Sequence, residues 1–88
     1  MSYYIYLIVS KVKNKSISYV GYTNNIKKRI KLHNIGKGAK FTRGRTWRLV
    51  YREYFKSKSK AISREYYIKN NRTLRNKIKN ENINSSSI

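Results

Sequence analysis

The sequence has no cysteine and no aspartate, and it contains only one histidine and three glutamates among 88 residues. Without cysteine there are no disulfides and no Cys-based zinc sites, and a single histidine excludes a zinc finger. Two-metal hydrolysis of a phosphodiester needs several carboxylates that converge on ions about 4 Å apart. Glu53, Glu65 and Glu81 are too few for that, so such chemistry here would need one carboxylate, one metal and a base of another residue type.

Long apolar segments are also missing. No apolar run reaches the roughly 18 residues of a membrane span, and the start MSYYIYLIVSK lacks the basic residues and cleavage site of a signal peptide. A membrane-surface protein would need a long amphipathic helix with Trp, Phe or Leu on one face, whereas the aromatic residues here lie in strand-like runs. We therefore expect no membrane partner and an intracellular location, in the cytoplasm, or in the nucleus of a eukaryotic or viral system.

Positive charge is abundant instead. Lys and Arg number 22 against 3 acidic residues, a formal net charge of +19, which favours a polyanionic partner. Nucleic acid, DNA or RNA, is the leading candidate, and a protein partner stays open. Biased base composition could account for the amount of lysine, but not for the position of Arg29. The length predicts one small domain over residues 1–79, followed by a disordered polar tail over 80–88.

Two strand-like segments open the chain. Residues 3–9 and 17–22 are rich in aromatic and β-branched residues with alternating faces, so they predict an antiparallel hairpin. With a loop at 11–14, Tyr6 would lie opposite Tyr19. A slip of one residue would put the two tyrosines on different faces, so their common face depends on the register.

A basic helix follows. Thr23, Asn24 or Asn25 can cap its start near Ile26, and the glycines of GKG at 36–38 predict its end near Ile35. The i, i+3, i+4, i+7 spacing places four side chains on one stripe, which we expect to face inward: Ile26, Arg29, Ile30 and His33.

The second half predicts a third strand over 46–55 and a second helix from Ser57 or Ser59 to about Asn70. Glu65 lies on the inward stripe of this helix, and a carboxylate in that position needs a partner. The segment after it predicts at most one short helical turn.

These residue types suggest a chemistry. Surrounding cations favour the phenolate of Tyr6 or Tyr19, which could then take a proton from water. An inward arginine, Arg29, can hold one phosphate and stabilise charge in phosphoryl transfer. His33, one turn later, is either a core histidine or a hydrogen-bond partner of the same phosphate or of the nucleophile.

The loop GKGAKFTRGR lacks the spacing of a phosphate-binding P-loop, so it is interpreted as a basic surface loop. We expect it, with one lysine of the preceding helix, to contact the nucleic-acid backbone through Lys28, Lys37, Lys40, Arg43 and Arg45.

The same residues resemble the GIY-YIG endonuclease superfamily. YIY at 4–6 stands where that family has GIY, and YVG at 19–21 stands where it has YIG. Residues 22–51 are similar to the family's helix, Gly-Lys-Gly turn and third strand, and AISREYYIK at 61–69 is similar to its glutamate helix. The resemblance covers roughly 3–75 and is closer to the small single-domain branch that includes Slx1-like nucleases and the N-terminal nuclease domain of UvrC.

The resemblance implies an α+β fold with a small three-stranded antiparallel sheet flanked by helices. It also implies phosphodiester hydrolysis with one divalent metal, Mg²⁺ or Mn²⁺, in DNA repair, recombination or the processing of mobile or foreign DNA. In the implied mechanism Glu65 holds the metal, Arg29 stabilises the phosphate, and one tyrosine, for preference Tyr19 over Tyr6, helps to deprotonate water. His33 takes the position of an auxiliary His or Tyr.

Some positions depart from the family pattern. Tyr4 replaces the first glycine of GIY, and Tyr22 stands where some members have a lysine. Many members have an asparagine after the glutamate helix, and here Asn70, Asn71 and Asn76 all qualify. Two other functions stay open: a non-catalytic nucleic-acid-binding module on the same fold, and a tyrosine that attacks phosphate covalently.

Overall fold

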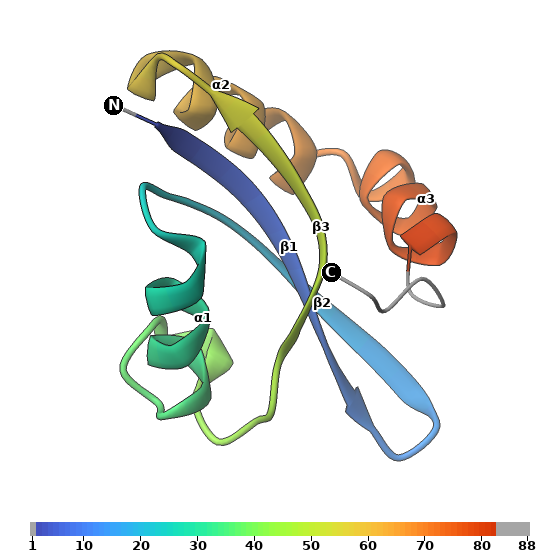
Figure 1. Ribbon diagram of the computed structural model, residues 1–88. Coiled ribbons are helices and arrows are strands. Elements are labelled where there is room, and N and C mark those ends of the chain that lie inside the picture. Colours follow the sequence, from blue (N-terminus) through green and yellow to red (C-terminus); the bar gives the residue numbers. More distant parts are fainter. Residues whose placement is uncertain (1, 83–88) are drawn as a thin grey trace.

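The computed structural model describes residues 2–82 as a three-stranded antiparallel sheet with helices on both faces (Figure 1). The strand order is β2-β1-β3, so β1 is central, and the predicted α+β fold is confirmed. No helix within residues 2–82 combines the length and the apolar character needed to cross a membrane. In chain order the elements are β1 (Tyr3–Val12), β2 (Lys15–Thr23), α1 (Ile26–Asn34), a short 3-10 helix (Lys40–Thr42), β3 (Arg48–Phe55), α2 (Lys58–Lys69) and α3 (Arg72–Asn82).

The β1–β2 hairpin closes with a tighter turn than the sequence predicted. The turn consists of residues 13 and 14, and Lys13 has the positive φ, 56°, that short hairpin turns favour. Tyr6 consequently pairs with Gly21, so the predicted pairing of Tyr6 with Tyr19 is wrong by two positions. Because side chains alternate with a period of two, this shift leaves both tyrosines on the same face.

The central strand is buried on both faces, which explains its nearly continuous apolar sequence. On one face, Ile5, Leu7 and Val9 pack in a cluster with residues of α2 and α3, including Ile68 and Ile78. Figure 1 shows α1 on the opposite side of the sheet from α3.

The second face of the sheet carries a smaller and more polar core. Tyr6 and Ile8 are buried there with Trp47, and Ile30 of α1 packs against them. The indole N–H of Trp47 donates to the carbonyl oxygen of Thr42 at 2.9 Å, which fixes the loop before β3 to this face. The candidate catalytic residues of β1, β2 and α1 all belong to this half of the molecule.

Helix α3 differs most from expectation, because an eleven-residue helix replaces the single turn predicted after α2. Leu74 and Ile78, four residues apart, pack against the core, and Ile78 is only 7% exposed. Two apolar residues in a polar segment give little periodicity to recognise, so the sheet that receives them decides the structure. Residues 80–82 of the predicted polar tail belong to α3, and the rest of that tail lies outside the described residues.

A partly buried ion pair joins α2 to β3. Arg64 donates to both carboxylate oxygens of Glu53, at 2.9 and 3.0 Å, and the hydroxyl of Tyr51 donates to the same carboxylate. Burial opposes ionisation of Glu53, but the Arg64 and Tyr51 hydrogen bonds outweigh it and lower its pKa. Burial and the neighbouring carboxylate raise the pKa of Tyr51 to about 12. This pair orients the helix that carries Glu65.

Candidate active site

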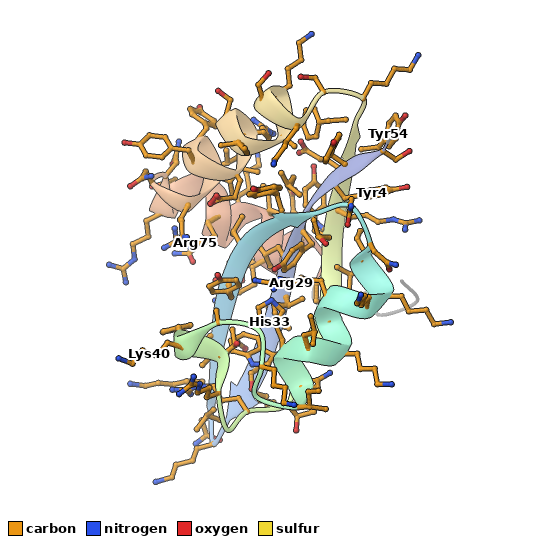
Figure 2. The ribbon with its side chains drawn as sticks, turned by 90° about the vertical axis from the view of Figure 1, so that its left-hand side faces the viewer. Tyr4, Arg29, His33, Lys40, Tyr54 and Arg75 are labelled. Atoms are coloured by element: carbon orange, nitrogen blue, oxygen red, sulfur yellow. The ribbon has the colours of Figure 1, made fainter. Side chains whose placement is uncertain are left out.

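Helix α1 presents Arg29 and His33 to the sheet (Figure 2). Asn25, one of the three predicted caps, holds the start of the helix through a side-chain hydrogen bond to its first turn. At the other end, the side chain of Asn34 bonds both the N–H and the carbonyl oxygen of Trp47. Both ends of α1 are thereby fixed, and the rotation of the helix that aims its arginine and histidine is set.

Tyr6 of β1 and His33 of α1 form a buried polar pair between the sheet and the helix. Their exposed fractions are 1% and 0%, and the hydroxyl of Tyr6 lies 2.8 Å from Nε2 of His33. The ring of Tyr19 packs against the same imidazole, with centroids 5.2 Å apart. His33 is therefore a buried core residue that contacts a motif tyrosine, and the alternative role predicted for it, a contact with the phosphate or the nucleophile, stays a prediction.

The hydrogen bonds of Thr42 assign the tautomer of His33. The Thr42 hydroxyl donates to the carbonyl oxygen of Ala39 at 2.9 Å, and its oxygen accepts the N–H of Ala39 at 3.2 Å. Because that hydroxyl proton is already used, the 2.8 Å contact between Nδ1 of His33 and Oγ1 of Thr42 places the proton on Nδ1. Nε2 then carries a lone pair and accepts the hydroxyl proton of Tyr6.

Arg29 completes this group, since its Nε donates to the Tyr6 hydroxyl at 3.4 Å. Burial raises the pKa of Tyr6, and the nearby guanidinium only partly offsets that effect. Burial, with a contribution from Arg29, lowers the pKa of His33 to about 4. Tyr6 therefore keeps its proton and His33 stays neutral near pH 7, which corrects the expectation that surrounding cations make Tyr6 a phenolate.

Two glycines make room for these rings. A Cβ atom at Gly21 would overlap the phenol of Tyr6, its partner across the hairpin, and one at Gly38 would overlap the imidazole of His33. Gly21 is the glycine of the YVG motif, and its role here is to let the hydroxyl end of the Tyr6 ring approach the backbone of the neighbouring strand closely.

One pocket of about 210 Å³ collects four of the five predicted catalytic residues: Tyr6, Tyr19, Arg29 and Glu65. The fifth, His33, lies behind Tyr6 and contacts it directly. Lys69 also lines the pocket, and its Nζ lies 5.5 Å from the centroid of the Tyr19 ring.

The pocket offers a metal a single carboxylate. The side chain of Glu65 is 14% exposed, and its Oε1 lies 3.6 Å from Nζ of Lys69, longer than a hydrogen bond. No group of three or more His, Cys, Asp or Glu side chains forms a metal cluster among residues 2–82. Mg²⁺ is commonly held by one or two carboxylates together with waters and substrate phosphates, so this donor set fits one such ion.

The five residues predicted to contact nucleic acid are accessible. Four are exposed on α1 and on the loop that follows it: Lys28, Lys37, Lys40 and Arg43. The fifth, Arg45, is half-buried because its guanidinium lies over the ring of Phe41, 5.7 Å from the centroid. Their role as backbone contacts stays a prediction.

The three asparagines that could complete the site according to the sequence differ in their contacts. The side chain of Asn70 donates to the carbonyl oxygen of Tyr66 near the end of α2, and that of Asn71 accepts the backbone N–H of Leu74 at the start of α3. Asn76 instead lines a groove beside the candidate active site.

Two residues of the site were not singled out from the sequence. Lys69 follows Glu65 by four positions on the same helix, a spacing that favours an ion pair and could have indicated it. Thr42 lies nine residues from His33 in a loop, where no local periodicity indicates such a contact.

Comparison with known proteins gives concordant matches. The GIY-YIG catalytic domain family matches residues 2–79. A UPF0213 protein of Clostridium perfringens is 57% identical over 65 residues, which are 73% of this chain and 69% of that protein. A UPF0213 protein of Staphylococcus haemolyticus is 52% identical over 68 residues, 76% of this chain and 79% of that protein. The solution NMR structure of a UPF0213 protein from Bacillus halodurans is 40% identical, with a TM-score of 0.50 over 89% of this chain and 82% of that one.

Proposed function

This chain belongs to the GIY-YIG catalytic domain family, and we propose on that basis that it is a metal-dependent endonuclease that hydrolyses phosphodiester bonds of DNA. The observation that carries the proposal is the convergence of Tyr6, Tyr19, Arg29 and Glu65 on one small pocket from four different elements. A net charge of +19 supports a polyanionic substrate.

Glu65 would hold a single Mg²⁺ or Mn²⁺ ion, with waters and a substrate phosphate as the other ligands. Bound there, the ion would supply a more acidic water and would neutralise charge on the phosphate. Nζ of Lys69 lies 3.6 Å from Oε1 of Glu65, so a cation held by this carboxylate would repel the lysine.

Arg29 binds the scissile phosphate in this proposal. Its Nε is engaged by the Tyr6 hydroxyl, which leaves the two terminal nitrogens for phosphate oxygens. The contact to Tyr6 holds the guanidinium in place before the substrate arrives, so little conformational freedom is lost on binding. Charge that develops on the phosphate during attack is then stabilised by a donor already in position.

In this proposal Tyr19, rather than Tyr6, takes a proton from the attacking water after its own phenol proton has passed to solvent. The pKa of Tyr6 lies above 10.0 and that of His33 is about 4. Moving the phenol proton to the imidazole would therefore be strongly unfavourable. Tyr6 is better suited to orient Arg29 and to accept a hydrogen bond from water. The Tyr19 side chain lines the same pocket, but its hydroxyl does not bond His33 as that of Tyr6 does.

A second function, a non-catalytic nucleic-acid-binding module, is favoured by one observation. Lys69 lies against the only carboxylate of the pocket and partly neutralises it. If that cation is not displaced, the protein binds nucleic acid through its basic surface without cutting it.

The test is a cleavage assay at low salt with Mg²⁺ and Mn²⁺. Duplex, single-stranded, flap and junction DNAs are compared with an RNA of equal length, and flaps and junctions are included because of the resemblance to structure-specific nucleases. We expect Glu65→Gln to lower cleavage by about a hundredfold or more while binding persists. Glu81→Gln removes the same charge from an exposed position of α3 and should cut normally.

The outcomes separate the two functions. Native protein that binds but cuts none of these substrates would exclude the nuclease and leave the binding module. A covalent protein–DNA adduct would point instead to direct attack by a tyrosine. The preferred substrate of an active enzyme would distinguish repair, recombination and the processing of foreign DNA.

A further inference from the structure

A basic groove of about 860 Å³ lies beside the candidate active site. One wall is the edge strand β2, from Ser16 to Val20, and the other is formed by the end of α2 and by α3. The groove is lined by four cations, Lys69, Arg72, Arg75 and Lys79. Among the described residues, no acidic side chain lines it.

The cations of α3 occupy one face of the helix. Arg72, Arg75 and Lys79 follow the i, i+3, i+7 spacing of a single stripe, and Leu74 and Ile78 pack another face into the core. Arg75 and Lys40 project on the same side of the molecule (Figure 2). The stripe is therefore directed at the groove rather than being a by-product of overall lysine content.

Phe41 provides an aromatic surface in the same groove. Its ring is 53% exposed and stacks on Tyr19, with centroids 6.1 Å apart and an interplanar angle of 20°. The Arg45 guanidinium, 5.7 Å from the centroid of the Phe41 ring, would move aside or stack on the base when a base binds. An exposed ring next to a basic wall is the combination by which proteins bind single-stranded nucleic acid, because every base has a face that can stack. A base inside a duplex already has both faces covered, so only an unpaired base can lie on Phe41.

The groove joins the candidate active site. Tyr19, Val20 and Lys69 line both the groove and the smaller pocket that contains Glu65. We propose that this groove binds an unpaired segment of the nucleic-acid substrate, with its phosphates along α3 and a base on Phe41, and delivers the adjoining phosphodiester to the pocket. The delivery step rests on the proposed nuclease, whereas the binding step does not.

An extended peptide is the other conceivable occupant, since β2 is an edge strand and could pair with an added strand. The four cations on the wall opposite this strand favour a ligand with a regular negative charge. An ordinary peptide would offer them no regular row of anionic groups.

The first experiment measures fluorescence anisotropy of a fluorescein-labelled 12-nucleotide oligo-dT in EDTA, where no metal-dependent cleavage occurs. Lys79→Gln is compared with Lys77→Gln, which removes the same charge from the exposed side of the same helix. One phosphate contact to a single strand contributes about 0.7 to the salt slope, so Lys79→Gln should weaken binding roughly fivefold at 0.1 M salt. Lys77→Gln should stay within about twofold of the native protein. Arg75 is not a suitable site, because it also donates to the carbonyl oxygen of Lys69.

The second experiment tests the aromatic surface with Phe41→Ala. Loss of one base stack should weaken oligo-dT binding about tenfold and leave binding of a 12-base-pair duplex within about twofold. The proposal is overturned if Lys79→Gln and Lys77→Gln weaken binding equally or if Phe41→Ala weakens duplex binding as much. It is also overturned if a labelled oligo-glutamate of equal charge binds as tightly as oligo-dT.

These results are independent of cleavage. If the protein cuts no substrate but Lys79→Gln binds oligo-dT more weakly than Lys77→Gln does, the groove proposal stands and the nuclease proposal fails. If the protein cuts DNA and the two variants bind oligo-dT equally well, the nuclease proposal stands and the groove proposal fails.

Discussion

Tyr6 and His33 illustrate how a polar pair can be kept in a small hydrophobic core. Each side chain is almost fully buried, and burial of an unpaired hydroxyl or imidazole would be costly. The chain of contacts from Arg29 through Tyr6 and His33 to Thr42 gives each polar atom a partner. The cost of burial appears instead in the titration of the histidine, whose neutral form alone fits this network.

The low pKa of His33 makes the folded state sensitive to acid. Its pKa is lowered from 6.5 to about 4 in the folded protein, so between these values the unfolded chain binds a proton that the folded chain does not. Stability is therefore lost as the pH falls from about 6.5 to about 4, and the total loss is about 3 kcal/mol. Urea unfolding at pH 7 and at pH 4.5 measures it.

The matched variant for this test is His33→Gln. It has no group that titrates in this range, so it should be less stable at pH 7 but should lose little further stability between pH 6.5 and 4.5. Both proteins should still weaken below pH 4.5, because Glu53 has a lowered pKa and contributes stability that is lost there. Parallel pH curves for the two proteins would show that His33 is not the group responsible.

The placement of the site residues could be predicted only as far as local periodicity reaches. The periodicity of α1 predicted that Arg29 and His33 point inward. The alternation of side chains along β1 and β2 predicted that Tyr6 and Tyr19 lie on the same face of the sheet. The exact register could not be predicted, because it depends on the positive φ of Lys13, a residue with no special preference for that conformation.

At the scale of elements, helix ends with clear caps were predicted well and α3 was not. Asn25 and Ser57 cap α1 and α2 as the sequence indicated. Helix α3 also has an asparagine at its start, Asn71, but it has few apolar residues and depends on the tertiary contacts of Leu74 and Ile78. The helix therefore forms because the assembled sheet receives its apolar side chains, and the sequence of this segment alone does not predict it.

The dependence of α3 on two apolar side chains can be measured. Ile78→Ala should lower the free energy of unfolding by about 2 to 5 kcal/mol, since it leaves a cavity under the helix. Thr73→Ala, at an exposed position of the same helix, should stay within about 0.5 kcal/mol of the native protein. Urea denaturation of both variants gives the comparison, and equal effects would mean that α3 is not held by its packing against the sheet.

At the scale of the whole molecule, charge is the dominant feature. The sequence has 22 Lys and Arg residues but only three glutamates, so there are too few acidic side chains to pair with most of the cations. Two of the glutamates are engaged, by Arg64 and by Lys69. A compact chain of 88 residues with a net charge of +19 repels itself, and that repulsion opposes folding.

Salt should therefore act on folding and on binding in opposite directions. Raising NaCl from 0.05 to 0.5 M shortens the screening length from about 14 Å to about 4 Å, weakens the self-repulsion and should raise the melting temperature. The same change should weaken DNA binding steeply, because each neutralised phosphate adds about 0.7 to 0.9 to the slope of log K against log salt. Thermal unfolding and anisotropy on one salt series measure both effects. A melting temperature that falls with salt would show that the cations are stabilised within the fold, and a slope below about 1 would show that nucleic acid is not held by its phosphates.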